Sequence, residues 1–130
     1  MEEQLLCKHQ VVGSNPTAGS MNKIIWVLVN CNTIKEAQQI GQEILKRRFV
    51  SCFDIIPRHS ASYYWPPKSG KIETTKGATL ILETFGEKYN LIKKEIKKLH
   101  SDKLPFIGFV EIKGIDKKYI NWIKCELKDE

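Results

Sequence analysis

The feature that most constrains this chain is a pair of long β-forming segments joined by a short turn sequence. Residues 50–65 read V-S-C-F-D-I-I-P-R-H-S-A-S-Y-Y-W, and residues 70–84 read G-K-I-E-T-T-K-G-A-T-L-I-L-E-T. Both are rich in β-branched and aromatic residues, which favour a pleated, half-buried surface. The residues P-P-K-S between them are typical of a turn. The sequence therefore predicts one β-hairpin with its tip near Pro67–Gly70.

The length of this hairpin is the second constraint. Each arm could reach about fifteen residues, whereas an ordinary strand has about 5–6. A small domain cannot cover arms of that length, so we expect the outer hairpin to pack against other copies of the same chain. Aromatic residues are common both at interface cores and in ligand clefts. We therefore predict an intersubunit interface or cleft formed by Tyr63, Tyr64, Trp65, Lys71 and Glu73.

The remaining segments complete a simple order of elements. An apolar run at residues 23–31 predicts a buried strand, and Thr33 with Glu36 forms a capping-box pattern for a helix that runs to about Arg48. Helical spacing recurs at residues 88–100, a strand is expected at 106–112, and a short helix at 117–127. The order β-α-β-β-α-β predicts an α+β, ferredoxin-like sandwich with a long central hairpin and a short C-terminal helix.

Composition places this fold in a single domain. The chain has 130 residues, of which 42% are apolar and 28% charged, as in one soluble globular domain. Residues 1–20 have a linker-like composition and are predicted to lie outside the fold, so residues 21–130 form the domain. Neither a membrane-spanning run nor a secretory signal is recognisable, so we expect a cytoplasmic protein with no membrane partner. The four cysteines form no C-x-x-C pair and are expected to be reduced thiols.

Several functions can be excluded from the residues. An RNA-recognition module needs aromatic rings on its central strands, and residues 27–29 and 78–82 provide none. The chain has no Gly-rich phosphate loop and no nucleophile elbow. The net charge of +6 first indicates solubility, and the lysines of residues 93–98 are expected to form a solvated helix face. We predict a protein that binds no nucleic acid and is not an enzyme.

A series of motifs in unbroken order resembles the CutA divalent-ion tolerance proteins. They are V-L-V-N-C, R-R-F-V-S-C-F-D-I-I-P, S-Y-Y-W, G-K-I-E, L-I-L-E-T, K-K-L-H, L-P and Y-I-N-W-I, and together they cover residues 23–127. The resemblance implies a ferredoxin-like subunit, a tight homotrimer held by edge-strand pairing, and a role in tolerance to copper and other divalent metals. It also implies metal ligands at Cys31, His100 and Cys52. Thiolate and imidazole suit copper or zinc.

The resulting hypothesis is a trimeric copper-tolerance protein that binds copper or another divalent cation weakly and without catalysis. Two alternatives stay open at this point. One is a trimeric signalling sensor that binds a small metabolite in the intersubunit cleft. The other is a structural trimer that affects metal tolerance indirectly.

Overall fold

The computed structural model describes residues 23–127. Its elements are β1 (Ile24–Cys31), α1 (Ile34–Lys46), β2 (Cys52–Tyr64), β3 (Ile72–Phe85), the 3₁₀ turn η4 (Gly86–Lys88), α2 (Tyr89–Leu99), β4 (Ile107–Ile112) and α3 (Lys117–Glu126). The predicted extension, residues 1–20, lies outside the described residues. The order of the described elements is the one that the sequence predicts.

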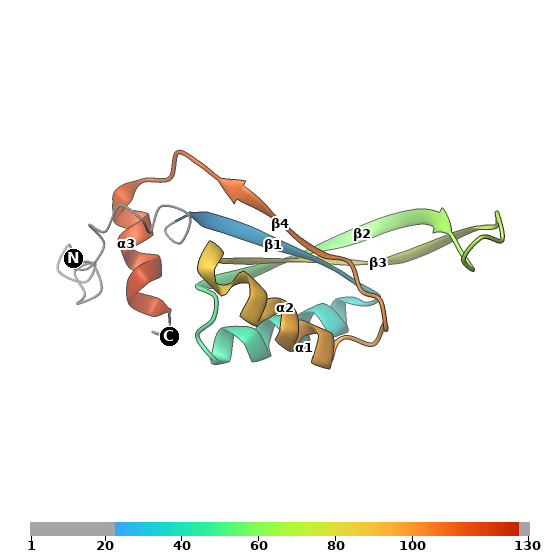
Figure 1. Cartoon of the computed structure of the whole chain (residues 1–130), viewed down its shortest axis with the longest axis horizontal. Coiled ribbons are helices and arrows are strands. Elements are labelled where there is room, and N and C mark those ends of the chain that lie inside the picture. Colours follow the sequence, from blue (N-terminus) through green and yellow to red (C-terminus); the bar gives the residue numbers. More distant parts are fainter. Residues whose placement is uncertain (1–22, 128–130) are drawn as a thin grey trace.

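The four strands form one antiparallel sheet in the order β2-β3-β1-β4. Helices α1 and α2 cover the same face of this sheet, and α3 lies at the end where β1 begins (Figure 1). Two β-α-β halves with both helices on one face are the ferredoxin-like arrangement. The predicted α+β fold is therefore confirmed. No helix within residues 23–127 has both the length and the apolar character that a membrane span requires.

The central hairpin extends well beyond the rest of the subunit (Figure 1). Strand β2 has 13 residues and β3 has 14, and they pair from Cys52 opposite Glu83 to Tyr64 opposite Ile72. The register shifts between Arg58 and Ala61, where the hairpin leaves the body. The outer half has side chains on both faces, and none of the helices described between residues 23 and 127 lies above it, so its aromatic residues are accessible in the single subunit.

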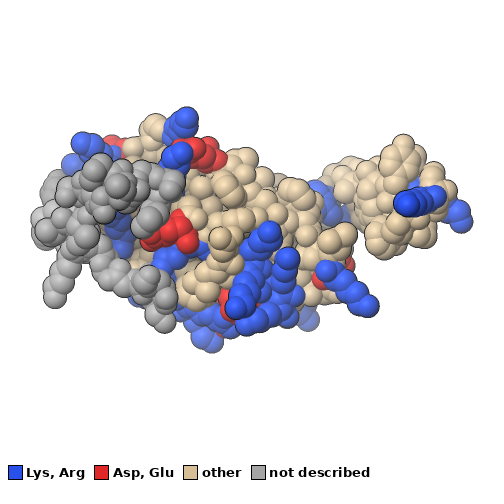
Figure 2. Space-filling model, viewed as in Figure 1, with Lys and Arg blue, Asp and Glu red and all other residues tan. Residues whose placement is uncertain are grey.

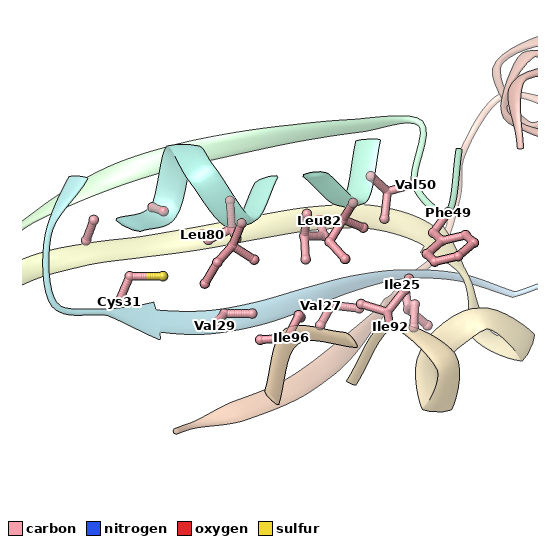
Figure 3. Close-up of a cluster of buried hydrophobic side chains, with 14 residues drawn as sticks. Ile25, Val27, Val29, Cys31, Phe49, Val50, Leu80, Leu82, Ile92 and Ile96 are labelled. Atoms are coloured by element: carbon pink, nitrogen blue, oxygen red, sulfur yellow. The ribbon is translucent and has the colours of Figure 1, made fainter. Parts of the chain in front are cut away.

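The core lies between the sheet and the two helices. Alternate residues of the central strands point toward the helices, among them Val27 and Val29 of β1 and Leu80 and Leu82 of β3, all 0% exposed. Figure 3 shows this cluster with Phe49 at one end and Cys31 at the other. Cys31, the last residue of the central strand β1, therefore lies at the end of the core, close to the start of α1 (Figure 3).

Local signals explain where the helices begin and end. Thr33 caps α1 by accepting a hydrogen bond from the Glu36 N–H at 2.9 Å, and Asp116 caps α3 by accepting from the Lys118 N–H at 2.8 Å. Helix α1 stops at Lys46, two residues before the predicted end, because Arg48 adopts a left-handed conformation with φ of 63°. Helix α3 docks through Ile123 and Leu127 on Ile24 and Phe85, a second, smaller cluster.

Candidate metal centre

Three potential metal ligands from distant parts of the sequence meet at one end of the core. Cys31 ends β1, Glu36 lies in the first turn of α1, and His100 follows the last residue of α2. One donor atom of each, the Cys31 sulfur, a Glu36 oxygen and a His100 nitrogen, lies within 4.8 Å of the other two. The sequence placed Cys31 and His100 in one site only through a family resemblance, and the structure brings these two residues together.

Glu36 is held rigidly by backbone donors. Its Oε1 accepts from the Asn32 N–H at 2.9 Å, and its Oε2 accepts from the Ser101 N–H at 2.8 Å. The carboxylate therefore bridges the start of α1 and the loop after α2. The capping-box prediction is correct for Thr33 but wrong for Glu36, whose side chain bonds the N–H of Asn32 and not that of Thr33. Burial acts to raise the pKa of Glu36, but these hydrogen bonds outweigh it, and the pKa lies below its ordinary value.

The protonation of His100 follows from its two hydrogen bonds. Its Nε2 lies 2.7 Å from the carbonyl oxygen of Asn30, which can only accept, so Nε2 carries the proton. Its Nδ1 accepts from the Asp102 N–H at 3.0 Å. The side chain is fully buried, and Nδ1 lies 3.7 Å from Glu36 Oε2. His100 is thus a neutral imidazole, and its Nδ1 lone pair is engaged by the Asp102 N–H.

Cys31 is a protonated thiol in this environment. Its residue is 1% exposed, and burial is the main reason that its pKa is raised to about 12. The negative charges of Glu36 and Asp102 act in the same direction, whereas the positive charge of Arg58 acts against them. A thiolate forms here only when a cation replaces the proton.

The donor set fits a soft or borderline metal ion. Thiolate sulfur and imidazole nitrogen are the ligands that Cu(I), Cu(II) and Zn(II) share, and one carboxylate oxygen completes three protein donors. Glu36 and His100 are held by hydrogen bonds to backbone groups, and Cys31 and His100 are shielded from water. Binding of one ion would displace the Cys31 thiol proton and break the hydrogen bond from the Asp102 N–H to His100 Nδ1.

Cys52 does not join this cluster. It pairs with Glu83 across β2 and β3, whereas Cys31 pairs with Ala78, five residues earlier in β3. Its thiol donates to Glu83 Oε1 at 3.5 Å, and the same oxygen accepts from the Tyr119 hydroxyl at 2.7 Å. Burial and then the Glu83 charge raise the pKa of Cys52 to about 12. The site implied by the resemblance therefore loses Cys52 and gains Glu36.

One further cysteine prediction is wrong. Within the described residues, Cys31 and Cys52 are free thiols, as expected, but Cys125 is disulfide-bonded.

The predicted interface residues lie together on the outer hairpin, away from the metal cluster. Tyr63 and Tyr64 are 42% and 71% exposed, and Trp65 is 50% exposed. Tyr63 pairs with Glu73 across the two strands, and the Trp65 N–H donates to the Lys71 carbonyl at 3.0 Å. The two predicted groups of residues are thus separate features of the subunit.

Sequence reasoning missed Glu36 as a member of the candidate metal cluster and Arg58 as a charge that acts on Cys31. Glu36 had a sufficient local explanation as a helix-capping residue. The available signal was its position five residues after Cys31, at a strand-to-helix turn that returns the chain to the end of the same strand. Arg58 gave no signal, because only the β2–β3 register places it beside Gly77 and the end of β1.

Comparisons with known proteins agree on one family. A family model described as CutA1 divalent ion tolerance protein matches residues 25–126. The divalent-cation tolerance protein CutA of Pyrococcus horikoshii is 30% identical over 94 residues, which span 72% of this chain and 88% of that protein. The protein of the same name from Archaeoglobus fulgidus is 28% identical over 98 residues, 75% of this chain and 92% of that protein.

A solved structure supports the same relationship. The structure described as the periplasmic divalent cation tolerance protein CutA from Archaeoglobus fulgidus superposes with a TM-score of 0.75 and 25% identity, and the match covers 81% of this chain and 99% of that one.

Proposed function

Because the chain belongs to the CutA1 divalent ion tolerance family, we propose that it supports metal tolerance by binding metal ions at Cys31, Glu36 and His100. The observation that carries the proposal is the convergence of a thiol, a carboxylate and an imidazole within 4.8 Å. The role is one of binding and not of catalysis, and the metal ion is the ligand that the protein takes up.

Each residue has a distinct part in this proposal. Cys31 loses its proton and supplies the thiolate. Glu36 already carries its charge, because its pKa lies below the ordinary value, with burial opposing and hydrogen bonds prevailing. His100 turns its Nδ1 lone pair from the Asp102 N–H to the ion, while Nε2 keeps its bond to Asn30. A second partner of this kind fixes the ring orientation of a metal-bound histidine.

The same details predict weak binding. Displacing a proton from a thiol with a pKa of about 12 opposes binding at neutral pH, since the ion competes with that proton. Breaking the hydrogen bond from Asp102 opposes it further. We propose copper as the preferred ion because copper heads the general order of divalent affinities and is favoured by sulfur in its reduced form.

Copper titration of single variants tests the site. We expect Cys31→Ser and His100→Ala to lose most of the affinity of the unmodified protein. Cys52→Ser is the matched control, because it removes a second buried thiol that lies outside the cluster, and it should bind copper normally. Equal binding by all four proteins would reject Cys31 and His100 as ligands.

We also propose that the functional unit is a homotrimer built on the outer hairpin. The support is the exposed apolar surface of a hairpin that no other element within residues 23–127 covers, including Tyr64, Trp65 and Ile72 at 71%, 50% and 64% exposure. The outer hairpin also carries few charged groups compared with the face over α1 and α2 (Figure 2). A chain that sediments as a well-folded 15.0 kDa particle at micromolar concentration would contradict this proposal.

The alternative function, a trimeric sensor of a small metabolite, stays a prediction. Titration with anionic metabolites in the absence of metal tests it.

A further inference from the structure

An arginine without an ion-pair partner among the described residues lies beside the candidate metal cluster. Arg58 of β2 stands opposite Gly77 of β3, and Gly77 is followed by Ala78, the residue opposite Cys31. A Cβ atom added to Gly77 would lie 2.5 Å from the Arg58 Nη2 and 2.6 Å from the Cys31 carbonyl oxygen. The absence of a side chain at Gly77 is therefore what lets the guanidinium lie across β3 against the end of β1.

This guanidinium lacks the partners that the other arginines have. Arg47 pairs with Glu43 and Glu95, and Arg48 pairs with Glu126. Within residues 23–127, Arg58 forms no such ion pair, and its Nε is buried without a hydrogen-bond partner. Its positive charge is therefore not cancelled by a contacting carboxylate.

The charges around the cluster come from four parts of the chain. Glu36 of α1 and Asp102 of the loop after α2 are negative, and Arg58 of β2 is positive. His100 is neutral by its hydrogen bonds, and Cys31 becomes negative only when it binds an ion. The fields of Glu36, Arg58 and Asp102 all reach the Cys31 thiol. A cation bound to that sulfur therefore feels the same three charges.

We propose that Arg58 sets the charge selectivity of the metal site, weakening the binding of divalent ions more than that of monovalent soft ions such as Cu(I). The reason is that Coulomb energy is proportional to the charge of the ion. An ion of charge +2 is repelled by Arg58 twice as strongly as an ion of charge +1 at the same position. The inference rests on the proposed metal site and adds to it the residue that discriminates between classes of ion.

The size of the effect follows from the same law. The estimate takes ~8 Å between the Arg58 guanidinium and the bound ion and an effective dielectric constant of ~40–80. Removing the Arg58 charge then strengthens the binding of a monovalent ion about 2- to 6-fold and that of a divalent ion about 6- to 30-fold. Salt screens both effects in proportion. The firm expectation is therefore the ratio: the logarithm of the gain for the divalent ion is about twice that for the monovalent ion.

The experiment compares Ag(I), a redox-inert probe for Cu(I), with Zn(II), each titrated calorimetrically into the full chain in a nitrate medium at fixed pH. Arg58→Gln and Arg58→Met remove the charge, and Arg58→Lys keeps it. Two neutral variants are used so that, if one of them folds poorly, the other still tests the proposal. Arg48→Gln is the matched control, because it removes an arginine charge that is paired with Glu126 away from the site.

We expect both neutral variants to gain more affinity for Zn(II) than for Ag(I), with Arg58→Lys and Arg48→Gln close to the unmodified protein. Equal gains for the two ions, or no gain, would overturn the role of Arg58 while leaving the site in place. If Cys31→Ser binds both ions as the unmodified protein does, the proposed site itself fails and this inference fails with it.

Discussion

Glu36 offers the sharpest test of how the candidate site is built, because one carboxylate joins two segments 65 residues apart. Replacing Glu36 by Ala leaves the N–H groups of Asn32 and Ser101 without acceptors. A hydrogen bond to a charged group contributes roughly 1.5–3 kcal/mol. The Glu36 side chain is 13% exposed, so water replaces the lost acceptor only in part. We therefore expect Glu36→Ala to lower the free energy of unfolding by about 2–4 kcal/mol at neutral pH.

The pH dependence of this loss has a definite sign. The pKa of Glu36 is lower in the folded chain than its ordinary value of about 4.5, with hydrogen bonds overcoming the opposing effect of burial. A carboxyl with a depressed folded pKa stabilises the fold above its unfolded pKa and loses that contribution as pH falls through the folded pKa. The difference in unfolding free energy between the unmodified protein and Glu36→Gln should thus be constant near neutral pH and shrink below about pH 4.5.

Urea unfolding at fixed protomer concentration measures both effects, since an oligomer changes its apparent stability with concentration. Glu87→Ala is the control, because Glu87 is an exposed acidic residue at the start of the 3₁₀ turn η4. A loss below about 0.5 kcal/mol for Glu36→Ala, the usual range for surface substitutions, would refute the bridging role of this carboxylate.

Three further predictions concern the site and its supports. The apparent affinity for Zn(II) should rise about tenfold per pH unit between about pH 7.5 and 9.5, because Cys31, with its pKa raised to about 12 mainly by burial, releases one proton on binding; a flat calorimetric profile would contradict this. Gly77→Ala should lower the free energy of unfolding in urea by about 1–3 kcal/mol, since the added Cβ would lie 2.6 Å from the Cys31 carbonyl oxygen. Unchanged stability would show that β1 and β3 can separate freely at this point. Ile123→Ala, at a side chain with 0% exposure, should cost about 2–5 kcal/mol; a thermal midpoint equal to that of the unmodified protein would mean that α3 is not docked through this residue.

Local sequence signals were sufficient for the elements of this fold. Thr33 and Asp116 mark helix starts because their side-chain oxygens cap free N–H groups, and both do so in the structure. Apolar spacing identified the buried face of α1 through Ala37, Ile40 and Ile44. Ile34 and Leu45, near the two ends of α1, are 46% and 37% exposed, because the ends of an amphipathic helix extend past the core that it covers.

The metal site could be anticipated only in part. Cys31 and His100 were paired through resemblance, and no local pattern relates them. Cys52 was grouped with them through the same resemblance, but the strand register places it beside Glu83. Glu36 was assigned to helix capping, where it makes only one of the two expected bonds. A residue that fits a local capping pattern can also contact residues far away in the sequence, and sequence spacing does not reveal those contacts.

Periodicity, capping residues and turn residues act over a few positions, so the chain's own order of residues determined its strands, its helices and the length of its hairpin. Which side chains meet at the end of β1 was decided by strand order and register, because these set distances between residues far apart in the chain. The tertiary structure alone therefore assembled a thiol, a carboxylate and an imidazole beside an arginine that has no ion-pair partner within residues 23–127.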